Sequence, residues 1–60
     1  MKPKCKLTGV DGNVYAILTK VAKTLERAGQ KEKVMEFLTK AKSGDYDHAL
    51  QVVNEYVDVE

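Results

Sequence analysis

Two stretches near opposite ends of the chain, Lys4-Cys5-Lys6-Leu7 and Val57-Asp58-Val59-Glu60, alternate charged and apolar residues with opposite charges. Laid antiparallel with Cys5 opposite Val59, they bring apolar side chains together on one face of a ribbon and opposite charges together on the other. The further matched pairs are Leu7 with Val57, Lys4 with Glu60 and Lys6 with Asp58. A register that satisfies packing and charge together specifies a strand pair. The two stretches therefore predict an antiparallel two-stranded ribbon.

Between these stretches, apolar residues recur at helical spacing and predict three helices. Their expected ranges are 14–28, 30–42 and 46–56. Asn13 and Asp45 are suited to cap the first and third helices, because their side chains can accept from free backbone N–H groups. Gly29 and Ser43-Gly44 are typical of the ends of the first and second helices.

The expected core follows one face of each helix. On the first helix it comprises Val14, Ile17, Leu18, Val21, Leu25 and Ala28, widened by Tyr15 and Ala22. On the second it comprises Val34, Met35, Phe37, Leu38 and Ala41, and on the third Tyr46, Ala49, Leu50, Val53 and either Tyr56 or Val57.

The connections complete the predicted topology. Residues 4–8 form the first strand, and Asp11-Gly12-Asn13 forms a turn in which Gly12 can take a positive φ. Neither Gly nor Pro separates the third helix from Val57, so the chain is expected to continue directly into the last strand, opposite in direction to the first. We predict a single α+β domain over residues 1–60, in the order strand-helix-helix-helix-strand. Its terminal strands pair antiparallel and pack on a three-helix layer.

Composition limits the class of protein. Sixty residues, 43% of them hydrophobic and 32% charged, are enough for one domain with one small core. The single cysteine, Cys5, excludes an internal disulfide and fits a reducing compartment. No apolar stretch resembles a signal peptide or approaches the ~20 residues of a membrane span. These features predict a cytoplasmic protein with no membrane association.

No group of residues predicts catalysis. Asp45-Tyr46-Asp47-His48 contains possible metal ligands, but side chains in a helix's first turn diverge, so capping by Asp45 and an exposed His48 are expected instead. Cys5 alternates with lysines on a strand and is expected to be a buried thiol rather than a nucleophile. We therefore predict no catalytic residues, no metal site, no cofactor and no enzymatic activity.

The charges are unevenly distributed. Residues 1–42 hold all ten Lys and Arg side chains and four acidic ones, a local charge of +6. Residues 43–60 hold five acidic side chains and no Lys or Arg, a local charge of −5. Two explanations of this uneven charge distribution are open. The two parts of the chain can attract each other within the fold, or one of them can form a binding face. The candidate binding residues are Lys20, Lys23, Arg27 and Lys31. The alternative is a solvated helix face, since Glu26 interrupts the stripe.

The chain also resembles short uncharacterised proteins of phages, prophages and bacterial mobile elements. The matching stretches are residues 7–15, 28–30, 43–51 and 56–60, which read LTGVDGNVY, AGQ, SGDYDHALQ and YVDVE. They hold turns, caps and strand ends, so the resemblance implies an origin and a shape rather than a chemistry.

Together these observations predict a small interaction protein of phage or mobile-element origin that binds a protein partner. The alternative is a nucleic-acid accessory protein that uses the basic face of the first helix. In both cases a monomer or a weak homodimer is expected. The sequence does not distinguish the basic helix face from the acidic C-terminal end as the working surface.

Overall fold

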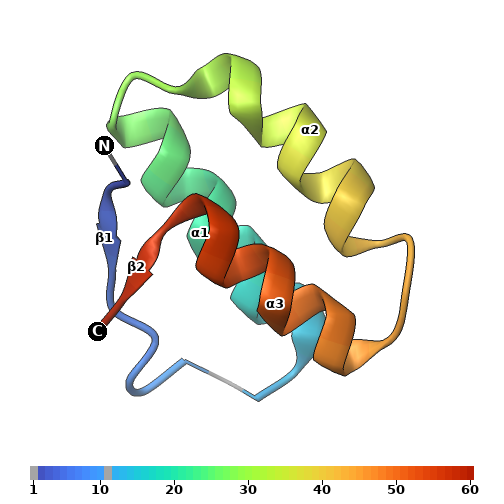
Figure 1. Ribbon diagram of the computed structural model, residues 1–60. Helices are drawn as coiled ribbons and strands as arrows, with labels where there is room; N and C mark the ends of the chain where they lie inside the picture. The colour runs from blue at the N-terminus through green and yellow to red at the C-terminus, as the bar shows by residue number, and fades with distance from the viewer. Residues whose placement is uncertain (1, 11) are drawn as a thin grey trace.

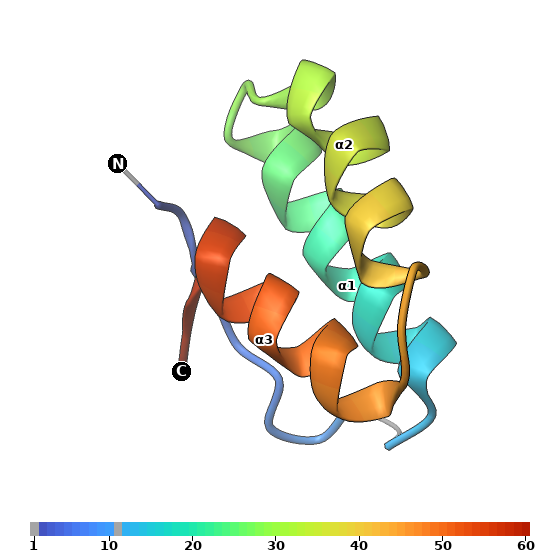
Figure 2. The same ribbon diagram turned by 45° about the vertical axis from the view of Figure 1, so that its right-hand side comes forward.

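Three helices make up most of the structure, a computed structural model that describes residues 2–10 and 12–60. The elements follow the order β1 (Lys4–Cys5), α1 (Val14–Arg27), α2 (Lys31–Ala41), α3 (Tyr46–Tyr56) and β2 (Asp58–Val59). The three helices pack on one another, and the strand pair lies against α1 and α3, away from α2 (Figures 1 and 2).

Local hydrogen bonds set the helix ends where the sequence predicts them. Asn13 Oδ1 accepts from the Tyr15 N–H at 2.8 Å, and Asp45 Oδ1 accepts from the His48 N–H at 2.9 Å. Gly29 ends α1 with a φ of 76°, which allows the Gln30 N–H to donate back to the Leu25 carbonyl at 2.9 Å. These caps confirm the predicted starts of α1 and α3, and α1 ends at Arg27, one residue before the predicted end.

The core lies where the helices meet beneath the strand pair. Phe37 of α2 and Leu25 of α1 are fully buried at its centre, and Phe37 meets the edge of the Tyr56 ring at a centroid distance of 5.4 Å. The other buried apolar residues are Cys5, Ile17, Leu18, Val21, Ala41, Ala49, Val52, Val53 and Val57. The predictions that Cys5 points inward and that Phe37 belongs to the core are confirmed.

The predicted strand arrangement is wrong, because β1 and β2 pair parallel. Lys4 lies opposite Asp58, and Cys5 lies opposite Val59. Each strand is only two residues long, so the fold is mostly helical, and the predicted strand over residues 4–8 is too long. The Val10 N–H instead donates to the Leu7 carbonyl in a turn.

The chain reverses direction at Val57, between α3 and β2. The Val57 N–H closes the last turn of α3 on the Val53 carbonyl, its backbone is extended, and its side chain is buried in the core. The chain bends back across the end of α3 here instead of continuing onward (Figure 1). β2 therefore runs in the same direction as β1, as Figure 1 shows.

Several smaller expectations are also corrected. Met35 and Tyr15, predicted to face the core, are 71% and 68% exposed. His48 is half-buried rather than exposed. In the loop before α1, Gly9 has a positive φ of 85°. Asp11, part of the predicted turn, lies outside the described residues.

Within residues 2–10 and 12–60, no helix combines the length and the apolar character needed to cross a membrane.

Candidate functional site

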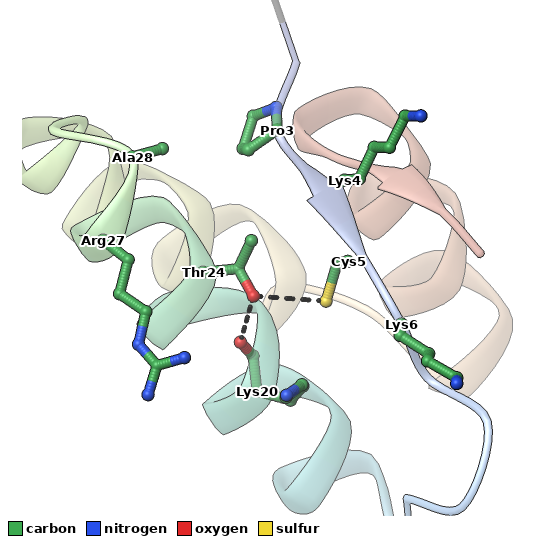
Figure 3. Close-up of a pocket in the computed structure, with 8 residues that line it drawn as sticks. All are labelled: Pro3, Lys4, Cys5, Lys6, Lys20, Thr24, Arg27 and Ala28. Atoms are coloured by element: carbon green, nitrogen blue, oxygen red, sulfur yellow. Dashed lines mark hydrogen bonds between the residues drawn. The ribbon is translucent and has the colours of Figure 1, made fainter.

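Two adjoining hollows lie along the exposed side of α1. The first, called here the basic groove, has a volume of about 350 Å³ and separates β1 from α1 (Figure 3). It is lined by Pro3, Lys4, Cys5, Lys6, Lys20, Thr24, Arg27 and Ala28. The second, the Tyr15 hollow, has a volume of about 560 Å³ and is lined by Val10, Tyr15, Ala16, Thr19, Lys20, Lys23 and Arg27. Lys20 and Arg27 border both hollows, so the two form one continuous surface.

The spacing of basic residues on α1 creates one wall of this surface. Lys20, Lys23 and Arg27 follow one another at intervals of three and four, which places them on one side of a helix. Leu18, Val21 and Leu25 turn the other side of α1 into the core. The cations of α1 therefore face outward, along the basic groove and the Tyr15 hollow.

The first strand forms the opposite wall of the basic groove. Cys5 points toward α1 and is 1% exposed, while its neighbours Lys4 and Lys6 point away from the helix layer (Figure 3). Thr24 Oγ1 lies 3.4 Å from Cys5 Sγ and donates to the Lys20 carbonyl at 2.9 Å. This contact joins β1 to α1 at the floor of the groove.

The electrostatic character of both hollows is cationic. No acidic residue lines either hollow within the part of the chain that the structure describes. The ion pair found among those residues, Lys40 with Glu55 at 3.4 Å, lies elsewhere, between α2 and α3. Lys20, Lys23 and Arg27 thus keep their charge available to an external anion, whereas Lys4 lies opposite Asp58 of β2. We call the side chains of Lys4, Lys6, Lys20, Lys23 and Arg27 the basic face.

The structure brings together only part of the predicted residue set. Lys20, Lys23 and Arg27 lie together, but Lys31 begins α2 beyond Gly29 and lines neither hollow. Sequence reasoning missed Lys4 and Lys6 as neighbours of the α1 cations. The alternating pattern of the chain ends paired these two lysines with the acids of the last strand. No local sequence pattern indicates which helix β1 packs against.

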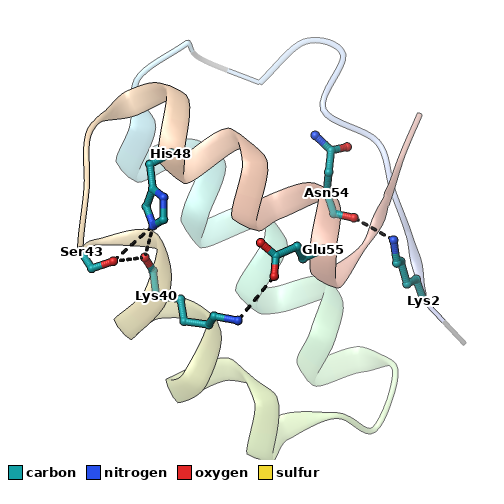
Figure 4. A network of polar contacts seen from close by, with 6 residues as sticks. All are labelled: Lys2, Lys40, Ser43, His48, Asn54 and Glu55. Atoms are coloured by element: carbon teal, nitrogen blue, oxygen red, sulfur yellow. Dashed lines mark hydrogen bonds and ion pairs between the residues drawn. The ribbon is translucent and has the colours of Figure 1, made fainter.

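The cluster around Asp45 has a structural explanation. Asp45 caps α3, and His48 Nε2 lies 2.9 Å from the Lys40 carbonyl and 3.2 Å from Ser43 Oγ (Figure 4). These contacts join the end of α2 to the start of α3. A search of the described residues finds no group of three or more His, Cys, Asp or Glu side chains able to hold a metal ion.

A second polar group lies at the other end of α3. Lys40 pairs with Glu55 and lies 5.6 Å from the centre of the Tyr56 ring, and Lys2 Nζ donates to the Asn54 carbonyl at 2.9 Å (Figure 4). The ionised Tyr56 and Glu55 raise the pKa of Lys40. Burial raises the pKa of Tyr56, and the Glu36 carboxylate adds to this. These contacts secure the C-terminal end of α3 rather than forming a site.

Comparisons with protein-family models, with curated proteins and with solved structures find no match for this chain. The chemistry of the basic face suits anionic groups.

Proposed function

We propose that this chain is a small, non-enzymatic interaction protein that binds an acidic protein partner on its basic face. The observation that carries the proposal is the lining of the two hollows, where lysines and an arginine gather without an acid among the described residues. Charge complementarity of this kind guides association and orients a partner. The net charge of only +1 means that attraction depends on this local face rather than on the whole molecule.

A labelled oligoglutamate peptide is the direct probe of the proposal. We expect binding at about 50 mM salt that weakens toward about 200 mM, because exposed charges are screened by salt. The double variant Lys20→Gln/Arg27→Gln removes the two cations that border both hollows and should weaken binding about tenfold or more. Lys31→Gln/Lys42→Gln removes equal charge from positions that line neither hollow and is the matched control. Equal loss in both variants, or no binding at low salt, would contradict the proposal.

A second candidate function, binding of single-stranded nucleic acid, is favoured by one observation. The Tyr15 ring is 68% exposed and lines a hollow together with Lys20 and Lys23. An exposed ring beside cations can stack a base while the cations hold its phosphates. An unstructured oligonucleotide separates the candidates. If it binds more tightly than oligoglutamate and loses affinity in Tyr15→Ala, the nucleic-acid function replaces the protein-binding one.

We further propose a phage or mobile-element origin and action in a bacterial cytoplasm, which the sequence resemblance supports. The genes beside the coding sequence test this proposal. Neighbouring phage structural, replication or integration genes would support it. A surrounding block of housekeeping genes in every genome that carries the sequence would contradict it.

A further inference from the structure

Among the described residues, the backbone hydrogen bonds of the first strand run along the edge that faces β2. The Pro3 and Cys5 carbonyls accept from the Asp58 and Glu60 N–H groups, both at 2.9 Å. Successive residues of a strand direct their backbone groups to opposite edges. Because the C=O and N–H of a trans peptide point in opposite directions, the N–H groups of Lys4 and Lys6 face the other edge of β1. An unpaired strand edge is a template for another extended chain.

That open edge borders the basic groove. β1 supplies one wall, and Lys20, Thr24 and Arg27 of α1 supply the other. The volume of about 350 Å³ falls at the small end of the range of about 300–1,000 Å³ for ligand sites, which suits a short extended segment rather than a helix. A segment placed here would have the peptide groups of β1 on one side and the cations Lys20 and Arg27 of α1 on the other.

The strand β2 shows what sequence suits a neighbour of β1. Asp58 lies opposite Lys4, and Val59 lies opposite Cys5 in the parallel register. An incoming strand with the same alternation would set acids beside Lys4 and Lys6 and a small apolar side chain toward Thr24. Cross-strand pairs of opposite charge stabilise such an arrangement.

We infer that the open edge of β1 accepts an extended acidic segment of a partner protein as a third strand, with acidic and small apolar residues alternating. The inference rests on the proposed function and specifies its partner and its geometry. Strand addition supplies affinity through main-chain hydrogen bonds and specificity through alternate side chains.

The described surface argues against two other occupants of this edge. A second copy presenting its own β1 would bring lysines opposite lysines, and like charges directly opposite destabilise a strand pair. A nucleic-acid backbone can neutralise the cations but has no regular peptide N–H and C=O groups to meet those of Lys4 and Lys6. Binding of either occupant would be detected in the following experiment.

The test uses the full chain and a labelled peptide of alternating Glu and Val. Two further versions of the peptide carry N-methyl groups, one on the Glu amides and the other on the Val amides, so each has one edge blocked at unchanged charge. Strand addition predicts that one version binds like the parent and the other about tenfold or more weaker. The version that loses affinity reports whether the added strand is parallel or antiparallel.

The possible results distinguish strand addition from the more general proposal that the basic face binds an acidic partner. If all three peptides bind the chain with equal affinity, and Lys20→Gln/Arg27→Gln lowers that affinity, strand addition is overturned and the basic face remains a binding site. Binding of none of these peptides, nor of oligoglutamate, would overturn both. Dimerisation that is abolished by Lys4→Pro, or preference for an oligonucleotide over every peptide, would assign the edge to another occupant and overturn the inference.

Discussion

Cys5 Sγ lies 3.4 Å from Thr24 Oγ1, so the short strand β1 is held against α1 by a buried side chain. The same contact forms the floor of the basic groove. The groove therefore exists only while β1 is docked, and docking can be measured through the thiol.

The first prediction concerns the reactivity of Cys5. Because the thiol is 1% exposed, a disulfide reagent should modify it about tenfold or more slowly in native protein than in protein unfolded by urea. Absorbance of the released reagent reports the rate. Equal rates in the two states would mean that β1 leaves α1 freely in solution.

The second prediction compares two valines near the C-terminal end of α3. Val57 is 1% exposed and Val59 is 43% exposed. Val57→Ala should lower the free energy of unfolding by about 1.5–2.5 kcal/mol, since it removes two buried methyl groups and leaves a cavity. Val59→Ala is the control and should change it by about 0.5 kcal/mol or less. Urea unfolding measures both. Similar effects would contradict the placement of Val57 in the core and of Val59 at the surface.

A third prediction concerns glycine conformation. Gly29 has a φ of 76°, so Gly29→Ala should cost about 1–2 kcal/mol of stability even though the space around it is open. Gly12 has open space too, and the positive φ values found among the described residues belong to Gly9 and Gly29, so Gly12→Ala should be neutral or slightly stabilising. Thermal unfolding of the two variants distinguishes them. A Gly12 variant that loses more stability than the Gly29 variant would be inconsistent with this backbone.

The fourth prediction is a loss of stability at alkaline pH. The pKa values of Tyr56 and Lys40 are both raised in the folded protein, so the folded state holds these protons more tightly than the unfolded state. Their stabilisation is present below the unfolded values of about 10 and is lost as pH rises through the raised values. The urea midpoint should fall above pH about 10. Tyr56→Phe, which keeps the ring, should make this fall shallower, and an unchanged pH profile in that variant would refute the assignment.

Short-range features were readable from the sequence because they depend on residues one turn apart. Asp45 and Asn13 cap the helices that follow them, and Gly29 ends α1. The strand direction was not readable, since an alternating pattern places Cys5 opposite Val59 in either direction. The direction follows from the way the chain bends back after α3, which neither Gly nor Pro near Val57 indicates.

The sequence predicted only part of the candidate site. The periodicity of α1 was enough to group Lys20, Lys23 and Arg27. Lys4 and Lys6 joined them only through the docking of β1 on α1, across a loop whose path no local rule determines. Lys31 was grouped with the set by sequence proximity, and the turn at Gly29 separates it from both hollows.

The central claim is that the open edge of β1 receives an acidic strand, and amide hydrogen exchange at Lys4 and Lys6 tests it most directly. On addition of the alternating Glu and Val peptide, both amides should become protected, whereas the Cys5 amide, which faces β2, should change little. If the peptide binds and the Lys4 and Lys6 amides exchange as fast as before, the partner lies on the basic face without joining the sheet, and the claim is wrong.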